Sequence, residues 1–181
     1  MKAFTLVFTI TMMMCIQDNS GTIFRADAAR ETSNWFVVND GVMGGLSKGN
    51  VNITDDGNVQ FSGYVSTDNN GGFSSIRYHF DPKNVSAFKY VVLHLKGDGK
   101  SYQFRIKANK AQRHSYISIF KTSGAWETIT IPLHSFYPSF RGYTLNIPNY
   151  NGETMEEVAF LIGNKVKEQF NLEIKSVSLK P

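Results

Sequence analysis

The chain has 181 residues, which fits one domain and is long enough to bury a substantial core. Charged residues make up 19% of it, below the share of a typical soluble domain, and strand-forming and turn-forming residues dominate. The formal net charge of +4 is modest. A total of this size does not indicate nucleic-acid binding, because clustering of charge matters more, so nucleic acid is not expected as a partner.

The N-terminal segment is typical of an export leader. Lys2 supplies a positive start, and residues 3–14 form an uncharged apolar run that is too short to span a bilayer. Cys15 follows directly, which indicates a bacterial lipoprotein acceptor; cleavage near Ala26-Asp27-Ala28 and an uncleaved N-terminus are the alternatives. We therefore expect a leader and short linker over residues 1–28 and a single domain over 29–181.

This leader predicts an exported protein of the periplasm or cell envelope, with a mitochondrial location as the alternative. Contact with a membrane is expected only through a lipid on Cys15. Because Cys15 is the only cysteine, the mature domain has no disulfide, no thiol nucleophile and no cysteine-based metal site.

Alternating apolar and polar residues predict a series of short strands. In the clearest of them, residues 101–107, the apolar side chains face one way and Gln103, Arg105 and Lys107 face the other. The predicted strands are 58–65, 71–80, 90–95, 101–107, 114–121, 126–131, 158–162 and 170–179. Turns rich in Gly, Asn and Asp separate them, so the sequence predicts an all-β sandwich or jelly roll.

The sequence also predicts the structure of two segments that connect strands. Lys96-Gly97-Asp98-Gly99-Lys100 is typical of a tight hairpin turn, because glycine supplies positive φ angles. Residues 81–87 are the one helical candidate, with Pro82 in the first turn.

The metalloprotease and nucleotide-binding motifs are absent from the sequence. It contains no His-Glu-x-x-His and no P-loop, and neither its histidines nor its acids share the spacing of a ligand set or a catalytic pair. We therefore expect no enzyme, no cofactor and no metal site. A calcium site at Asp68-Asn69-Asn70 is a weak alternative, because hard cations bind clustered oxygens.

The densest basic region lies between residues 96 and 114. Its members are Lys96, Lys100, Arg105, Lys107, Lys110, Arg113 and His114. Such a region suits an acidic partner, an anionic lipid or a nucleic acid. A solvated sheet face is the preferred interpretation, because acids elsewhere can balance these charges.

The segment Trp35–Ser47 fits no simple element. Asn39-Asp40-Gly41 turns the chain, and Gly44-Gly45 permits a bulge or a close approach of two backbones. We prefer a structural turn and bulge that seats Trp35 and Met43 in the core over a ligand-binding loop.

Several motifs that follow one another along the chain together resemble those of a known protein family. They are Asn39-Asp40-Gly41-Val42-Met43-Gly44-Gly45-Leu46-Ser47, Phe61-Ser62-Gly63, Gly71-Gly72-Phe73-Ser74-Ser75-Ile76-Arg77, Lys96-Gly97-Asp98-Gly99-Lys100-Ser101-Tyr102, Trp126, Ile131-Pro132-Leu133, Phe136 and Phe140-Arg141-Gly142. Over about residues 33–179 the chain resembles the complex I intermediate-associated protein 30 (CIA30) family.

The resemblance implies a galactose-binding-like jelly-roll β-sandwich without catalytic activity. Mitochondrial members are chaperone-like assembly factors for respiratory complex I, and some plant relatives that carry a Rossmann domain act on RNA. This chain has no Rossmann Gly-x-Gly-x-x-Gly motif and no matrix-type transit peptide. We expect a non-catalytic, protein-binding assembly or chaperone-like factor of the NADH:ubiquinone oxidoreductase intermediate-associated type.

The candidate binding residues, taken from these motifs, are Asp40, Met43, Arg77, Asp98 and Arg141. Buried pairing between Arg and Asp side chains is the alternative role for them. The alternative function is an exported carbohydrate-binding module, because jelly rolls of this kind hold sugars on aromatic platforms. Its candidate platforms are Tyr137, Phe140, Tyr143 and Tyr150.

Overall fold

The computed structural model describes residues 21–26 and 32–181, so the predicted leader up to residue 20 lies outside the described residues. The strands of the described part are β1 (Thr22–Arg25), β2 (Trp35–Asn39), β3 (Lys48–Ile53), β4 (Val59–Val65), β5 (Ser74–Asn84), β6 (Tyr90–Lys96), β7 (Ser101–Lys107), β8 (Ser115–Lys121), β9 (Trp126–Pro132), β10 (Tyr137–Phe140), β11 (Tyr143–Thr144), β12 (Thr154–Ile162) and β13 (Glu168–Lys180). Three short 3₁₀ helices accompany them in that part: η2 (Asp40–Met43), η3 (Asp68–Asn70) and η4 (Leu133–Ser135). No helix among these residues has the length and apolar character needed to cross a bilayer.

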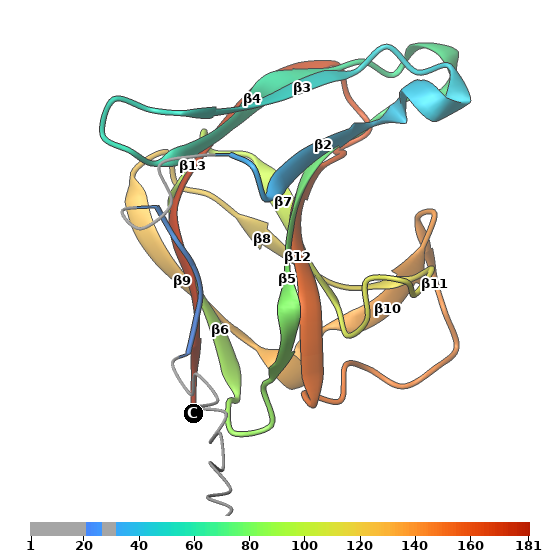
Figure 1. Ribbon diagram of the computed structural model, residues 1–181. Coiled ribbons are helices and arrows are strands. Elements are labelled where there is room, and N and C mark those ends of the chain that lie inside the picture. Colours follow the sequence, from blue (N-terminus) through green and yellow to red (C-terminus); the bar gives the residue numbers. More distant parts are fainter. Residues whose placement is uncertain (1–20, 27–31) are drawn as a thin grey trace, which may run out of the picture.

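The described strands form two antiparallel sheets that pack face to face (Figure 1). One is six-stranded, with the order β3-β4-β13-β6-β9 and β1 paired to β13; the other is seven-stranded, with the order β11-β10-β8-β7-β12-β5-β2. The predicted all-β jelly-roll sandwich is therefore confirmed.

The core lies between the sheets and consists of the apolar side chains that alternate inward. In β7, Tyr102, Phe104 and Ile106 are buried, as the alternation predicted. Phe104 makes an edge-to-face contact with Phe160 of β12, with ring centroids 5.1 Å apart. Such contacts add to the free energy gained by removing the rings from water.

The predicted hairpin at residues 96–100 is wrong. β6 pairs with β13 and β9, whereas β7 pairs with β12 and β8, so the turn carries the chain from one sheet to the other. Gly99 does adopt the expected positive φ of 81°. The alternation of two successive strands identifies both strands but does not say that they pair with each other.

The predicted helix at residues 81–87 is also wrong, because β5 continues to Asn84. Lys83 and Asn84 pair with Met155 and Thr154 of β12, and the register shifts just before them. Pro82 lies within this irregularity, where the ladder does not require the N–H that proline lacks.

Strand β1 lies within the stretch that the sequence assigned to the leader and linker. It pairs with β13, and the Phe24 side chain is only 2% exposed. The Phe24 ring meets Trp35 and Tyr78 edge to face, at centroid distances of 5.2 and 5.5 Å. The packed domain therefore includes residues that precede position 29.

Replacing Phe24 with Ala tests this packing. Because the change leaves a cavity next to Trp35, we expect the free energy of unfolding to fall by about 3 to 5 kcal/mol in urea denaturation. Tyr143→Ala is the control: this side chain is 76% exposed, and its loss is expected to change the free energy by no more than about 0.5 kcal/mol. Equal effects of the two substitutions would contradict a core role for β1.

Candidate functional site

The Asp40 carboxylate, at the start of η2, is buried and its acceptor positions are occupied. Oδ1 accepts the backbone N–H of Ser47 at 3.1 Å, and Oδ2 accepts the Ser47 hydroxyl at 2.5 Å. Oδ2 also accepts the N–H groups of Gly72 and Phe73, at 2.7 and 3.3 Å. One carboxylate thus holds the η2 loop against the segment that leads into β5.

Two opposing effects act on the pKa of Asp40. Burial by itself would raise the pKa, because it disfavours the charged form. The hydrogen bonds from Ser47, Gly72 and Phe73 together outweigh burial, so that the pKa lies below its ordinary value of 3.8. The ionised carboxylate therefore stabilises the folded state at neutral pH.

The glycines of the motif leave room for this carboxylate. A methyl group on Gly45 would lie 2.3 Å from Cγ of Asp40, and one on Gly71 would lie 2.6 Å from Oδ2. Gly44 ends η2 with a φ of 83°, in the left-handed region that glycine adopts without strain. This geometry agrees with the predicted structural turn; Trp35 is buried as expected, while the Met43 side chain lies outside what the structure describes.

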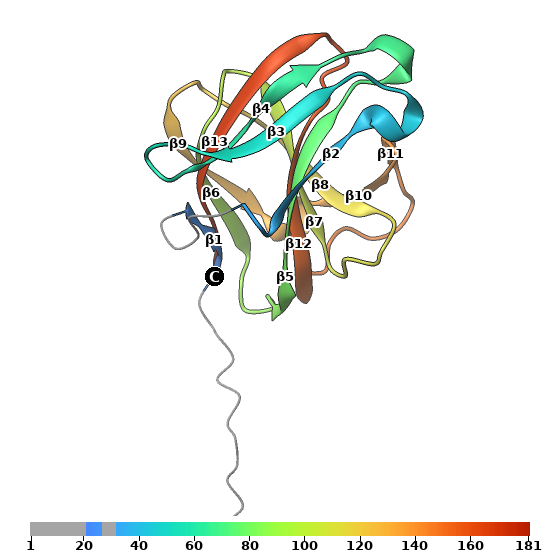
Figure 2. The same cartoon turned by 45° about the horizontal axis from the view of Figure 1, so that its top comes forward.

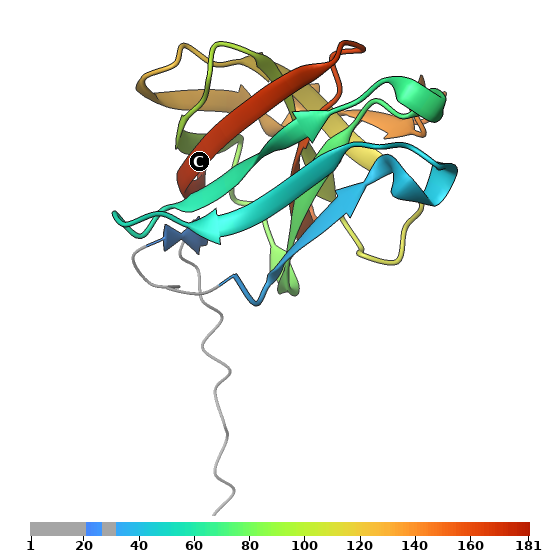
Figure 3. The same ribbon diagram turned by 90° about the horizontal axis from the view of Figure 1, so that it is seen from above.

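Asn39, the residue before Asp40, joins the two sheets at one edge of the sandwich. Its side-chain oxygen accepts the Gly49 N–H from β3 at 3.1 Å and the Ser74 hydroxyl from β5 at 2.6 Å. Figure 3 shows β2 of the seven-stranded sheet running beside β3 of the six-stranded sheet at this edge. The Asn-Asp pair of the motif therefore closes the edge and anchors the adjoining loop.

Asp98 has a similar role at the turn between β6 and β7. Its carboxylate accepts the Tyr102 hydroxyl at 3.0 Å, the Asn171 N–H of β13 at 3.0 Å and the Lys100 ammonium at 2.7 Å. Burial, with Asp98 nearby, strongly raises the pKa of Tyr102, so that its hydroxyl keeps the proton that it donates. Asp98 thereby fixes the connection between the two sheets.

Arg141 lies in the tight turn between β10 and β11 with a φ of 50°. Its guanidinium lies 5.3 Å from the centroid of the Phe140 ring, and the Arg113 guanidinium lies 5.1 Å from the same centroid. Both distances are typical of cation–π contacts.

Arg77 differs from the other candidates because it projects from the seven-stranded sheet on the side away from the core. Among the described side chains, no hydrogen bond or ion pair joins any two of the candidates Asp40, Arg77, Asp98 and Arg141. The structure therefore does not bring these residues together into one site, and the alternative of buried Arg–Asp pairs does not occur among them: Arg77 pairs instead with Glu157.

The outward side of the seven-stranded sheet, here called the outer face, is the strongest candidate surface. Figure 1 shows this sheet curved, with β2 and β10–β11 on the same side of the central strands β5 and β12. Residues directly opposite in an antiparallel pair project to the same face. By this register, one row across the outer face consists of Phe36, Arg77, Ala159, Arg105, Ile117 and Tyr137.

A buried carboxylate surrounded by three basic side chains lies beside this row. Glu157 of β12 has a side chain only 4% exposed, and its carboxylate is 2.7 Å from Nε2 of His79, 3.8 Å from Arg77 and 3.9 Å from Nζ of Lys107. Sequence reasoning named Arg77 as a candidate and placed Lys107 on an outward face. It missed Glu157 and His79, whose proximity depends on the pairing of β12 with its two neighbours.

Arg105 is partly buried on the outer face without a carboxylate partner. Its Nε and Nη2 donate to Oε1 of Gln103 at 3.0 and 2.7 Å, and in the described part of the chain no carboxylate oxygen lies within 4.0 Å of it. Burial, reinforced by the like charge of Arg77, lowers the pKa of Arg105 to about 10. The group remains charged at neutral pH, and the more distant Glu157 carboxylate offsets only part of the cost of its burial.

The basic residues that the sequence grouped together do not form one patch. Lys96 lies on the six-stranded sheet and pairs with Glu173 at 3.9 Å, and Lys100 pairs with Asp98. Arg105 and Lys107 are the members that the register of β7 places on the outer face.

Two of the four proposed aromatic platforms are not free to stack on a sugar ring. Tyr150 is buried, and its hydroxyl donates to the Thr154 carbonyl at 2.6 Å. The Phe140 ring is in contact with the guanidinium groups of Arg113 and Arg141. Tyr137 is half-buried in the outer face, and Tyr143 is exposed.

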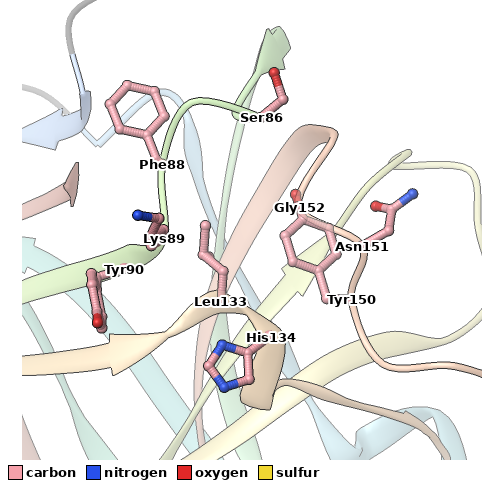
Figure 4. A pocket seen from close by; sticks show the side chains of 9 residues that line it. All are labelled: Ser86, Phe88, Lys89, Tyr90, Leu133, His134, Tyr150, Asn151 and Gly152. Atoms are coloured by element: carbon pink, nitrogen blue, oxygen red, sulfur yellow. The ribbon is translucent and has the colours of Figure 1, made fainter. Parts of the chain in front are cut away.

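A small pocket lies at the end of the sandwich where the chain passes from β5 to β6. It has a volume of about 220 Å³, with Lys89 and Tyr90 on one side, Tyr150 and Asn151 on the other, and Leu133 and His134 between them (Figure 4). Sites for drug-sized ligands are larger, at roughly 300 to 1,000 Å³. This pocket is therefore a weaker candidate than the outer face.

The calcium hypothesis receives no support from the side chains at residues 68–70. Asp68 pairs with the Lys167 ammonium at 2.7 Å and accepts the Ser66 hydroxyl at 3.1 Å. The hydrogen bond from Lys167 is the main cause that lowers the pKa of Asp68. Across residues 21–26 and 32–181, no group of three or more His, Cys, Asp and Glu side chains is placed to hold a metal ion.

The two packed antiparallel sheets form a jelly-roll β-sandwich (Figure 2). The sequence model of the Complex I intermediate-associated protein 30 (CIA30) family matches residues 24–174, and the chain belongs to this family. No curated protein matches the sequence significantly.

Solved structures with a similar fold include carbohydrate-binding proteins. A family 11 carbohydrate-binding module from Clostridium thermocellum, in complex with a β-1,3-1,4-mixed-linked tetrasaccharide, has 17% identity and a TM-score of 0.59 over 83% of this chain and 90% of that chain. An exo-β-agarase has 7% identity and a TM-score of 0.58, over 90% of this chain and 25% of the agarase. At such identities the similarity shows the fold alone.

Asp40→Asn tests the role of the buried carboxylate. The amide cannot accept all of these hydrogen bonds, so we expect the free energy of unfolding at pH 7 to fall by about 2 kcal/mol or more. The pKa of Asp40 is lowered in the folded state, so its stabilising effect is present above about pH 4 and is lost as the pH falls through the folded pKa. The difference from wild type should therefore narrow in acid.

Urea denaturation at several pH values measures this difference, with Asp55→Asn, an exposed acid in the β3–β4 turn, as the control. A stability difference for Asp40→Asn that is small at pH 7, or that widens in acid, would contradict a stabilising role for the ionised carboxylate.

Gly45→Ala and Gly41→Ala form a matched pair within the same motif. The added methyl group at Gly45 collides with Asp40, whereas one at Gly41 meets no atom within 4 Å. We expect Gly45→Ala to lower the free energy of unfolding by at least about 2 kcal/mol. Gly41→Ala should stay within about 1 kcal/mol of wild type in the same denaturation assay. If Gly41→Ala lowered the free energy of unfolding more than Gly45→Ala, the space that Asp40 requires would not explain the glycine at position 45.

Proposed function

We propose that the protein is a non-catalytic binding module that holds a protein partner on the outer face of the seven-stranded sheet. The observation that carries this proposal is the composition of that face. Arg77 and Arg105 lie in its middle, with exposed apolar side chains, Phe36 and Ile119, on either side. Arginine and aromatic residues are enriched where proteins meet and dominate the binding free energy there.

Membership of the CIA30 family supports the same function, because the family is named for association with complex I intermediates. We propose an assembly or chaperone-like role of that type. Two of the motif residues, Asp40 and Asp98, accept hydrogen bonds from their own neighbours, so they contribute by stabilising the fold.

A carbohydrate ligand is the second candidate function. The family 11 module of similar fold binds a tetrasaccharide, and Tyr137 and Tyr143 of this chain retain accessible ring surface. A sugar chain is held by rings that stack on its own rings. The aromatic residues of the outer-face row, Phe36 and Tyr137, lie at its two ends with the arginines between them, an arrangement that favours a protein over a neutral sugar.

Site-specific photo-cross-linking tests the protein-binding proposal. A photoreactive amino acid replaces Ile119, which is 59% exposed on the outer face, or Tyr64 of the six-stranded sheet as the control. We expect a discrete protein adduct from position 119 and none from position 64 in cells that produce the protein. Because we propose that the protein is exported, the adduct is expected in the envelope fraction.

Equal adducts from both positions, or none from position 119 together with binding to a glycan array, would overturn the protein-binding proposal. The second result would favour the carbohydrate alternative.

A further inference from the structure

The charges on the outer face are unbalanced where the face is least exposed. Three cations, Arg77, Arg105 and Lys107, lie around the single carboxylate of Glu157. Within the described residues, no other carboxylate oxygen lies within 4.0 Å of any of these three. Burying a charge costs free energy, and one carboxylate offsets only part of this cost for three cations.

The two arginines are placed to act together. Ala159 pairs with Arg105 on one side and with Arg77 on the other, so the two residues flank a small buried side chain in the same row. With strands about 4.8 Å apart, their backbones are separated by roughly 10 Å, a distance that two arginine side chains can span from both sides. Arg77 is close enough for its charge to lower the pKa of Arg105.

Neither guanidinium has all of its hydrogen-bond donors occupied by the contacts that it makes. Arg105 donates two hydrogen bonds to a neutral amide, and Arg77 lies at a long 3.8 Å from the Glu157 carboxylate with a side chain 33% exposed. A guanidinium carries five donors in a planar fork, which matches a carboxylate with two parallel hydrogen bonds. Both groups therefore retain donors for a carboxylate that arrives from outside.

From this arrangement we infer that the outer face binds an acidic segment of a partner protein, with an Asp or Glu carboxylate held between Arg105 and Arg77. This inference rests on the proposed protein-binding function and names the chemistry of the partner. A second copy of this chain suits the face less well, because the chain carries a net charge of +4. The apolar side chains of Phe36 and Ile119 then contact the residues on either side of the acidic ones.

The test measures the affinity of the full chain for a fluorescein-labelled octapeptide rich in Glu, by fluorescence anisotropy at low salt. The same peptide with Gln in place of Glu controls for charge, and oligogalacturonate is the carbohydrate competitor. We expect binding of the Glu peptide, weaker binding as salt is raised, and about tenfold or greater loss for the Gln peptide.

The variants Arg105→Gln and Arg77→Gln locate the site, and Arg25→Gln, an exposed arginine on β1 of the six-stranded sheet, is the matched control. Each outer-face variant should raise Kd by about tenfold or more, while Arg25→Gln should stay within about twofold of wild type. If Arg105→Gln fails to fold, Arg77→Gln carries the test, because its side chain is a third exposed.

Melting temperature separates a binding role from a structural one. Since the Arg105 guanidinium has no carboxylate partner, Arg105→Gln should melt at the same temperature as wild type or higher, while binding is lost. A lower melting temperature with unchanged affinity would overturn the inference and make Arg105 a structural residue.

The remaining outcomes separate this inference from the proposed function. Equal affinity for the Glu and Gln peptides, or no binding of either, overturns the acidic-segment inference, while an adduct at position 119 still supports a protein partner. Binding of oligogalacturonate without binding of the Glu peptide overturns the inference as well, and points to an acidic carbohydrate on the same face.

Discussion

The buried Asp40 carboxylate is the interaction on which the loop end of the sandwich depends. It accepts hydrogen bonds from the backbone N–H groups of Ser47, which precedes β3, and of Gly72 and Phe73, which follow β4. A buried charge is tolerated only where hydrogen bonds replace its lost hydration, and four of them do so here. The requirement for room around the carboxylate explains why the nearby chain contains glycine. The next residue back, Asn39, extends the same network across the edge where the two sheets meet.

Structure and binding are assigned to different parts of the molecule. The carboxylates of Asp40 and Asp98 are satisfied internally, and the free energy of their hydrogen bonds holds loops and sheet connections in place. The outer face differs: Arg105 is charged and partly buried, and its guanidinium donates hydrogen bonds to the neutral Gln103 amide and not to a carboxylate. Natural proteins retain such unfavourable arrangements where function requires them. Among the residues that identify the family by sequence, Asp40 and Asp98 therefore stabilise the fold, whereas Arg77 belongs to the outer face, where we place the ligand.

Local sequence pattern predicted β4 to β9, β12 and β13, but not the partners of these strands. Alternation located β4 and β7 to within a residue, because each has one face in the core and one outside. It missed β3, whose sequence Lys-Gly-Asn-Val-Asn-Ile is polar, as suits the edge strand of a sheet. The sequence pattern also could not predict the outer face, because it does not give the partners of each strand. Arg105 was predicted to face outward, but its approach to Arg77 requires β12 to lie between β5 and β7, and no property of a single strand encodes that order.

The most direct test of this division is a chemical-shift map of the full chain, labelled with nitrogen-15, recorded with and without the Glu-rich octapeptide. This division predicts shifts at outward positions of β5, β7 and β12, including the Arg105 side chain, and little change at Asp40 or along the η2 loop. Shifts centred on the η2 loop, with the outer face unchanged, would contradict this division and indicate that the glycine-rich motif is a ligand-binding loop.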